Sequence, residues 1–184
     1  MTMQAEHKEW LSRMYPKQPA YIPAAGCVEE AGELMHVLLK KEQEAMWGKE
    51  SRYADADWAI ALVDAIGDCA IYACSLCTTN EYDYKSILTM AKSRVEGCIR
   101  CGYPMVNAND DCCPDGEKHE YIPIAPLTAA AHLVSAAANV VLRPTSSIAI
   151  ADYLKALLGV AKVCHVDFDK AVEITWQEVK RRKR

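Results

Sequence analysis

The segment WAIALVDAIGDCAIYACSLC, residues 58–77, constrains the fold more than any other part of this chain. It is apolar on almost every side of a helix, so it can be buried only at the centre of a helical bundle. Its two charges, Asp64 and Asp68, are four residues apart and share one helix face, which Tyr72 continues. A buried, unpaired carboxylate is costly, so this face requires a proton, a cationic side chain or a metal ion.

The rest of the chain also has helical patterns, and no segment shows the alternation expected of a strand. Alanine, leucine, glutamate and lysine dominate the long segments, which favours helix. We therefore expect an all-α fold, with helices at 4–14, 22–45, 55–78, 81–100, 125–142, 146–164 and 167–182.

Composition excludes several classes of protein. The net charge of −4 does not predict a broad nucleic-acid-binding surface. The sequence lacks an apolar run of about 18 residues, so no membrane span is expected. Its first residues lack the apolar core of a signal peptide. We expect a cytoplasmic protein that binds neither membrane nor specific nucleic acid.

A second helical segment, CVEEAGELMHVLLKK at 27–41, carries three glutamates beside an apolar stripe. At 100° per residue, Glu30 and Glu33 lie together at one border of this stripe, and Glu29 points further out. Glu30 and Glu33 therefore project toward the element that packs beside the stripe. The stripe itself consists of Val28, Ala31, Leu34, Met35 and Leu38.

If this helix packs on the one at 55–78, the four carboxylates Glu30, Glu33, Asp64 and Asp68 form an oxygen-only cage. Such a cage suits a hard cation such as Mg²⁺ or Mn²⁺. The alternative is that the glutamates form a solvated rim and the aspartates pair with lysine or arginine. For Glu29 the solvated rim is the preferred interpretation.

The quoted residues resemble the MazG-type all-α nucleoside triphosphate pyrophosphohydrolases. The family signature is Glu-Glu-x-x-Glu followed, on the next helix, by Glu-x-x-Asp. Residues 29–33 match the first part, Asp68 matches the final aspartate, and Tyr72 matches a tyrosine often found one turn later. The expected second-helix glutamate is Ala65 here, with Asp64 as a possible substitute. The resemblance covers residues 20–100 and implies a MazG-like helical bundle.

The resemblance also implies an activity: hydrolysis of a (d)NTP to (d)NMP and pyrophosphate. Glu30, Glu33, Asp64 and Asp68 would bind Mg²⁺ or Mn²⁺, and Glu29 would be the general base or position the water. Lys40 and Lys92 are candidates for offsetting phosphate charge, and Tyr72 for contacting the bound nucleotide. A duplicated chain could complete internally the bundle that single-unit relatives form by dimerisation, and it could still pair again, so a homo-oligomer is expected and its state is left open. The preferred base is left open.

The nine cysteines fall into two groups. Five lie in apolar helical patterns and are predicted to be reduced core residues: Cys27, Cys69, Cys74, Cys77 and Cys164. The other four belong to a stretch rich in glycine, proline, asparagine and aspartate at 98–119. There Cys98-x-x-Cys101-Gly has the form of a zinc knuckle, which Cys113 and His119 could complete, with Cys112 as the rival third ligand. A disulfide or free thiols are the alternatives.

The two halves of the chain are related at an offset of 84 residues. At this offset Asp68 aligns with Asp152 and Asp83 with Asp167. We interpret this as duplication of a helical unit. The predicted organisation is an acidic unit at 1–100, a cysteine-rich zinc-binding insert at 101–124, and an acid-depleted second unit at 125–184 that packs on the first.

Two other functions fit parts of the sequence. A zinc-stapled helical interaction module with a vestigial site is the non-enzymatic alternative. A di-iron carboxylate protein is suggested by Glu33-x-x-His36, but such sites usually need a second Glu-x-x-His, and none accompanies Asp64 and Asp68.

Overall fold

The computed structural model describes residues 2–47, 55–94 and 125–182, and within them it has seven helices and no strand. The predicted all-α class is therefore confirmed for these residues. The predicted helix bounds agree with the observed ones to within three residues, apart from the end of the fourth helix. The helices are α1 (Met3–Met14), α2 (Tyr21–Trp47), α3 (Asp55–Thr79), α4 (Tyr84–Arg94), α5 (Pro126–Leu142), α6 (Ser147–Val163) and α7 (Phe168–Val179).

The observed start of α4 differs from the predicted one, and a capping residue explains the difference. The sequence pattern placed it at 81, but the carboxylate of Asp83 accepts a hydrogen bond from the backbone N–H of Ser86 at 2.9 Å. Asp83 is thus the residue that caps the helix, because such a side chain satisfies an N–H that lacks a partner in the first turn. The helix therefore begins at Tyr84.

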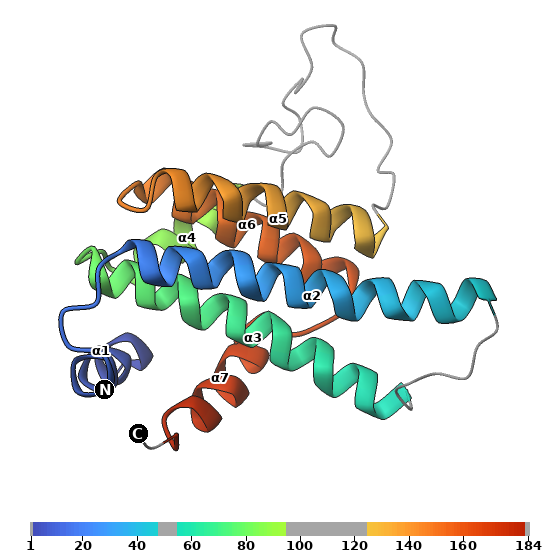
Figure 1. The fold of residues 1–184 in the computed structure, drawn as a ribbon, viewed down its shortest axis with the longest axis horizontal. Helices are drawn as coiled ribbons and strands as arrows, with labels where there is room; N and C mark the ends of the chain where they lie inside the picture. The colour runs from blue at the N-terminus through green and yellow to red at the C-terminus, as the bar shows by residue number, and fades with distance from the viewer. Residues whose placement is uncertain (1, 48–54, 95–124, 183–184) are drawn as a thin grey trace, which may run out of the picture.

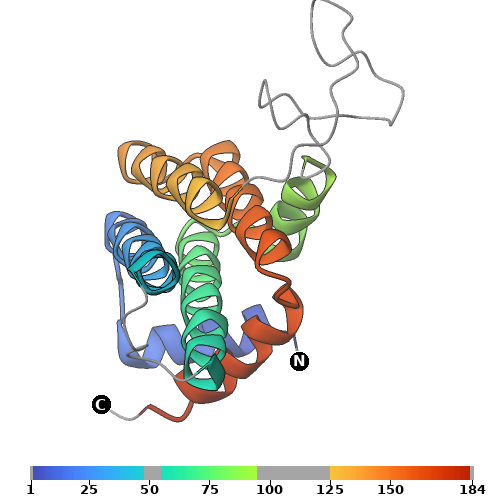
Figure 2. The same ribbon diagram turned by 90° about the vertical axis from the view of Figure 1, so that its right-hand side faces the viewer.

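The helices are stacked in layers. α2 and α3 run side by side in the middle, with α5 and α6 covering one face and α1 and α7 lying on the other (Figures 1 and 2). α3 is at the centre and contacts α1, α2, α4, α6 and α7. Its 57–79 stretch is long and apolar enough to cross a membrane, yet 67% of its most apolar window is buried by the other helices. That burial is the environment of a core helix.

Buried side chains tie the layers together. The Tyr153 hydroxyl of α6 is fully buried and donates to the backbone oxygens of Cys27 at 3.3 Å and Cys69 at 3.4 Å. One tyrosine thus joins α6 to both α2 and α3. On the other face, the Nε2 atom of His7 lies 3.0 Å from the Ser75 hydroxyl, which joins α1 to α3.

The two halves of the chain share a turn geometry. Glu81 and His165 have φ values of 60° and 56°, and each is the second residue after the end of a helix. The next residue of each turn donates its N–H five residues back: Tyr82 to Cys77 at 2.8 Å and Val166 to Ala161 at 2.9 Å. This hydrogen-bond pattern is a Schellman motif in both cases.

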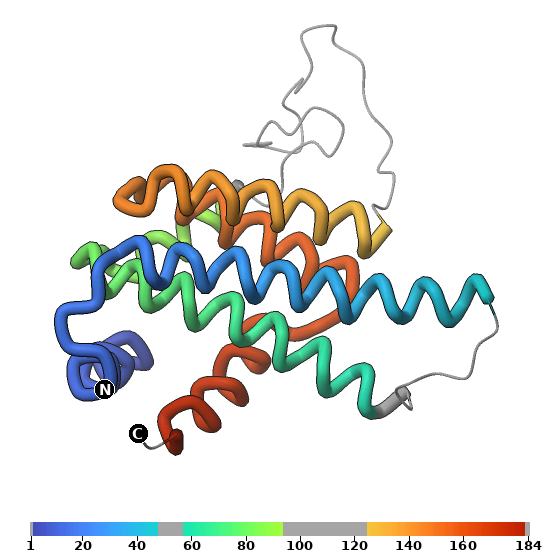
Figure 3. The backbone as a smooth tube through the Cα atoms, in the orientation of Figure 1, coloured from blue at the N-terminus to red at the C-terminus, as the bar shows by residue number. Residues whose placement is uncertain are grey.

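The helix pairing is also repeated. α2 packs on α3 as α5 packs on α6, and α7 packs on α3 as α4 packs on α6 (Figure 3). This arrangement is what an exchange of α2–α4 with α5–α7 about a twofold axis would produce. It supports the interpretation of duplicated units, whose boundaries stay a prediction. The insert at 101–124, with Cys101, Cys112, Cys113 and His119, lies outside the described residues, as does Cys98.

The five helical cysteines are free, and Cys27, Cys69, Cys74 and Cys77 are buried, as predicted. Cys164 is only partly buried. Burial raises the pKa of Cys74 well above its ordinary value and leaves its thiol protonated, so the Cys74-x-x-Cys77 pair is core packing at this position.

Candidate acidic site on helices α2, α3 and α7

The packing of α2 on α3 determines which of its glutamates face the neighbouring helix. Cys27, Ala31 and Leu34 are completely buried. Glu30 lies at the border of this buried stripe and is half-buried, whereas Glu29 and Glu33 are exposed. Glu30 therefore lies at the edge of the stripe, whereas Glu33, which was predicted to lie there with it, is exposed to solvent, and the assignment of both as metal ligands stays a prediction.

Glu30 is the most perturbed carboxyl group of the site. Burial and then the charge of Asp68 raise its pKa to about 7, and Glu33, Glu29 and Asp64 add smaller repulsions. The other four carboxylates singled out by the sequence therefore all lie within electrostatic range of Glu30. Because they come from two helices, only the α2–α3 packing brings them together.

The aspartates of α3 face the same region. Asp68 is half-buried, and burial followed by the charge of Asp64 raises its pKa to about 6. Asp64 is more exposed, and its pKa is raised by burial and by Glu178 of α7. The residue at the family's expected glutamate position, Ala65, is buried in the core with 8% of its surface exposed. Asp64, and not residue 65, is thus the acidic neighbour of Asp68.

Tyr72 closes one end of the acidic region. Burial raises its pKa, and so do the charges of Glu30 and Glu29. Its ring lies over Gly26 of α2, where a β-carbon would be 2.0 Å from the Cε1 atom of Tyr72. The absence of a side chain at Gly26, one turn before Glu30, therefore makes room for the ring.

Helix α7 and the residues directly after it contribute two charged residues that the sequence analysis did not include. Glu178 raises the pKa of Asp64 and Asp68, and Arg182 lowers the pKa of both. A close contact with α3 brings α7 to this place, since a β-carbon on Gly67 would lie 1.9 Å from the Thr175 hydroxyl oxygen. A glycine in the middle of an apolar helix was the available sequence signal for such a contact.

The grouped carboxylates differ from an assembled metal site. Among the residues that the structure describes, no three Asp, Glu, His or Cys side chains are close enough to hold a metal ion together. The carboxylates are therefore close enough to repel one another, but they are not arranged to bind one Mg²⁺ ion at the ligand distance of about 2.0–2.1 Å that it requires. Their chemistry fits a hard cation, because every donor is a carboxylate oxygen. Binding one requires the flexible glutamate side chains to turn toward the aspartates.

The predicted cationic residues lie elsewhere. The Lys92 ammonium bonds both carboxylate oxygens of Asp169, at 3.1 and 3.2 Å, in an exposed ion pair between α4 and α7. The Lys40 ammonium is 3.4 Å from the amide oxygen of Gln43 on its own helix. Neither lysine is among the groups that shift the pKa of Glu30 or Asp68. Arg182 is the cation that does act on Asp68, and it forms no ion pair with that carboxylate in the described part of the chain.

Comparisons with protein-family models, curated proteins and solved structures found no match for this chain. The resemblance to MazG-type enzymes and the expected oligomer therefore stay predictions, and function is argued from the site.

Proposed function

We propose that this chain is a divalent-metal-dependent nucleotide pyrophosphohydrolase. It would cleave a (d)NTP between the α and β phosphates, releasing (d)NMP and pyrophosphate. The observation that carries this proposal is the grouping of acids from α2 and α3, where burial and then mutual repulsion raise the pKa of Glu30 to about 7 and of Asp68 to about 6. Holding like charges together at half-buried positions costs stability, which a bound cation would recover.

Glu30, Glu33 and Asp68 are the residues that would hold Mg²⁺ or Mn²⁺, with Asp64 beside them. The cation would supply positive charge to the phosphate oxygens, which a polyanionic substrate needs in order to approach four carboxylates. Glu30 and Asp68 are the half-buried acids of this set, and an ion bound beside them loses competing water, whereas Glu33 and Asp64 would reach it from exposed positions.

Glu29 is the proposed general base. It is exposed, so it stays free to bind a water molecule at the rim. Glu29 takes one proton from this water as the water oxygen attacks the α-phosphorus. The bond from the α-phosphorus to the bridging oxygen then breaks, and the electron pair leaves with pyrophosphate.

Arg182 and Tyr72 complete the proposed site from its two ends. Arg182, three residues after the end of α7, acts on the charges of Asp64 and Asp68 and would offset charge that develops on the leaving pyrophosphate. Tyr72 follows Asp68 by one turn and presents a ring wall and a hydroxyl near Glu30, where it would contact the nucleotide.

The test is a panel of dNTPs and NTPs with Mg²⁺ or Mn²⁺, in which phosphate is measured with and without added inorganic pyrophosphatase. Pyrophosphohydrolysis gives phosphate only when the coupling enzyme is present, and chromatography then shows the NMP. Phosphate without the coupling enzyme would indicate a phosphatase. If folded protein turns over no nucleotide with either metal, the proposal is wrong and the helical interaction module is favoured.

A further inference from the structure

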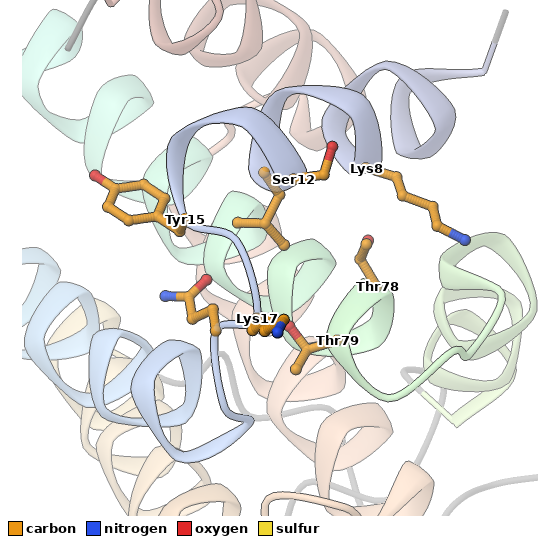
Figure 4. A pocket seen from close by; sticks show the side chains of 8 residues that line it. Lys8, Ser12, Tyr15, Lys17, Thr78 and Thr79 are labelled. Atoms are coloured by element: carbon orange, nitrogen blue, oxygen red, sulfur yellow. The ribbon is translucent and has the colours of Figure 1, made fainter.

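A surface hollow of about 200 Å³ lies between α1, the turn after it and the C-terminal end of α3 (Figure 4). Its lining includes Lys8 and Lys17, but Figure 4 shows the Lys8 side chain extending away from the other labelled side chains. Lys17 is exposed on the turn after α1. Among the described residues, the hollow therefore lacks the converging charges that would hold a ligand, and the contact that bears on the acidic site lies in the buried core.

Tyr153 of α6 lies at the junction of three helices. Its side chain is fully buried, and its hydroxyl is 3.3 Å from the backbone oxygen of Cys27 in α2 and 3.4 Å from that of Cys69 in α3. Each of these carbonyls accepts from its own helix and has a second lone pair for the hydroxyl. One hydroxyl proton is shared between two acceptors, which agrees with distances longer than the usual 2.7–2.8 Å of an O–H···O bond. The hydroxyl therefore holds α2 and α3 together at one point.

The two carbonyl groups belong to the helical turns that carry the acids. A helix carbonyl points toward the residue four positions further along the chain, so the Cys27 oxygen lies level with Glu30 and the Cys69 oxygen lies just beyond Asp68. Burial raises the pKa of Tyr153 well above its ordinary value, and the charge of Glu30 is among the smaller causes of this shift. The hydroxyl is therefore a neutral donor within electrostatic range of Glu30.

The α2–α3 pair is held from both sides at this level. On the acidic side the ring of Tyr72 lies over Gly26, where a β-carbon would be 2.0 Å from the ring. On the opposite side α5 and α6 cover the pair, and Tyr153 reaches it from α6 (Figure 2). The ring contact limits how closely the helices approach, and the hydroxyl resists their separation. Together these two tyrosines fix the spacing between Glu30 and Asp68.

The hydroxyl is a feature of the second helical unit alone. Tyr153 aligns with Cys69 at the offset of 84 residues, and the structure repeats this offset, since α3 ends at Thr79 and α6 at Val163. Two aligned residues that touch lie at the axis relating the two units. Two copies of the acidic unit would place a cysteine against a cysteine there, with no hydroxyl to reach Cys27. The acid-depleted unit therefore supplies a group that the acidic unit lacks.

We propose that Tyr153 is a positioning residue of the acidic site, which holds α2 and α3 at the spacing at which Glu30 and Asp68 share one divalent cation. This inference rests on the proposed function, because that reaction requires the cation. It gives the acid-depleted unit a role in the chemistry of the other unit. Since Tyr153 is fully buried, it acts through the two helices and does not touch the nucleotide. Removing its hydroxyl should therefore disturb the cation and leave the nucleotide contacts in place.

The test compares Tyr153→Phe with Tyr84→Phe in the full-length protein. Tyr84 is a matched control because it is also buried, and its hydroxyl has no partner among the described residues. At saturating Mg²⁺, Tyr153→Phe should lower kcat at least about tenfold and change the KM for the nucleotide by less than about threefold, because displaced groups weaken transition-state binding. Its Kd for Mn²⁺, measured by calorimetry, should rise at least about fivefold, as when a group that orients metal ligands is removed. Tyr84→Phe should leave kcat, KM and this Kd unchanged.

A purely structural role of Tyr153 gives a different result. Tyr153→Phe would then melt at a lower temperature, while the folded protein keeps the wild-type kcat and the wild-type Kd for Mn²⁺. That result overturns the proposal.

The wild type separates this proposal from the proposed function. Mn²⁺ binding without nucleotide turnover would refute the pyrophosphohydrolase, and the Kd of Tyr153→Phe would still test the tyrosine. Turnover by the wild type, with kcat and Kd unchanged in Tyr153→Phe, would refute the role of Tyr153 alone. If the wild type binds neither Mn²⁺ nor Mg²⁺, both proposals are wrong.

Discussion

Gly26 of α2 and Tyr72 of α3 occupy adjoining space so closely that a β-carbon on the glycine would lie 2.0 Å from the tyrosine ring. Gly26 precedes Glu30 by one turn, and Tyr72 follows Asp68 by one turn. The contact thus sets the spacing of the two helices beside the acidic residues, and it links helix packing directly to the geometry of the proposed site.

Replacing Gly26 by alanine should therefore displace the Tyr72 ring. We expect Gly26→Ala to lower the free energy of unfolding by about 1–3 kcal/mol, the usual cost of overpacking. Nucleotide hydrolysis should fall with it, since Glu30 and Asp68 no longer face each other at the same distance. Denaturant unfolding and the coupled phosphate assay measure the two effects.

Gly32→Ala is the matched control on the same helix. A β-carbon at Gly32 meets nothing within 4 Å, so the substitution should stabilise the protein by up to about 1 kcal/mol through helix propensity. Equal stability changes in Gly26→Ala and Gly32→Ala would contradict the close contact with Tyr72.

The contact of Gly67 with Thr175 makes a similar prediction for α7. A β-carbon on Gly67 would lie 1.9 Å from the Thr175 hydroxyl oxygen and 3.0 Å from the backbone oxygen of Ala171, so the neighbour cannot simply rotate away. Gly67→Ala should destabilise the protein by about 1–3 kcal/mol. Gly159→Ala in α6, where a β-carbon meets nothing within 4 Å, should not. Thermal unfolding of the two variants side by side tests this packing.

Most of the fold could be predicted from the sequence, because the apolar 58–77 segment has to be central and the other helices show their own periodicity. The spacing of residues along each predicted helix also indicated that Glu30 and Asp68 lie at the borders of helix faces that pack against each other. The contributions of Glu178 and Arg182 could not be predicted, since they depend on how α7 packs across α3, which no local pattern encodes. For the same reason the sequence did not predict the ion pair between Lys92 of α4 and Asp169 of α7.

Amide variants of the acids should separate stability from activity. Glu30→Gln and Asp68→Asn keep the side-chain shape and remove a repelling charge, so both should melt at a higher temperature than the wild type in chelator. Each should lose nucleotide hydrolysis by at least about 100-fold and lose stabilisation by Mg²⁺. Asp152→Asn, at the aligned position of the second unit, should leave hydrolysis unchanged. Retained activity in Glu30→Gln would remove Glu30 from the metal site.

The buried His7 predicts a loss of stability in acid. Burial lowers its pKa from 6.5 to about 4. The Ser75 hydroxyl donates to the Ile71 oxygen at 3.0 Å, so His7 donates from Nε2, and its Nδ1 has no partner among the described residues. The unfolded chain therefore takes up a proton first as pH falls, and stability is lost between pH 6.5 and about 4. The full effect is on the order of 3 kcal/mol.

The variant His7→Gln isolates this contribution. Glu30 and Asp68 titrate in an overlapping pH range, and their effect on the free energy of unfolding has the opposite sign. Both residues are present in the wild type and in the variant, so their effect cancels when the two free energies of unfolding are subtracted. Urea unfolding gives the free energy of unfolding of wild type and variant from about pH 4 to pH 7. The difference between these two free energies should become smaller as the pH falls. If this difference in free energy stays constant over the pH range, His7 has an ordinary pKa in the folded protein.

Protons and divalent cations should compete at the acidic site. The pKa of Glu30 is raised to about 7 by burial and by its acidic neighbours, so this carboxyl group holds a proton in much of the protein near neutral pH. In the folded state, raised carboxyl pKa values stabilise at low pH, and this contribution is lost as pH rises through about 7. A bound cation replaces the lost protons, so Mg²⁺ should raise the melting temperature more at about pH 8 than at about pH 5.5.

Calorimetric titration in buffers of different ionisation enthalpy should show proton release on Mg²⁺ binding near pH 7, and Glu30→Gln should release fewer protons. Mg²⁺ stabilisation that does not change between these pH values would place the cation away from Glu30.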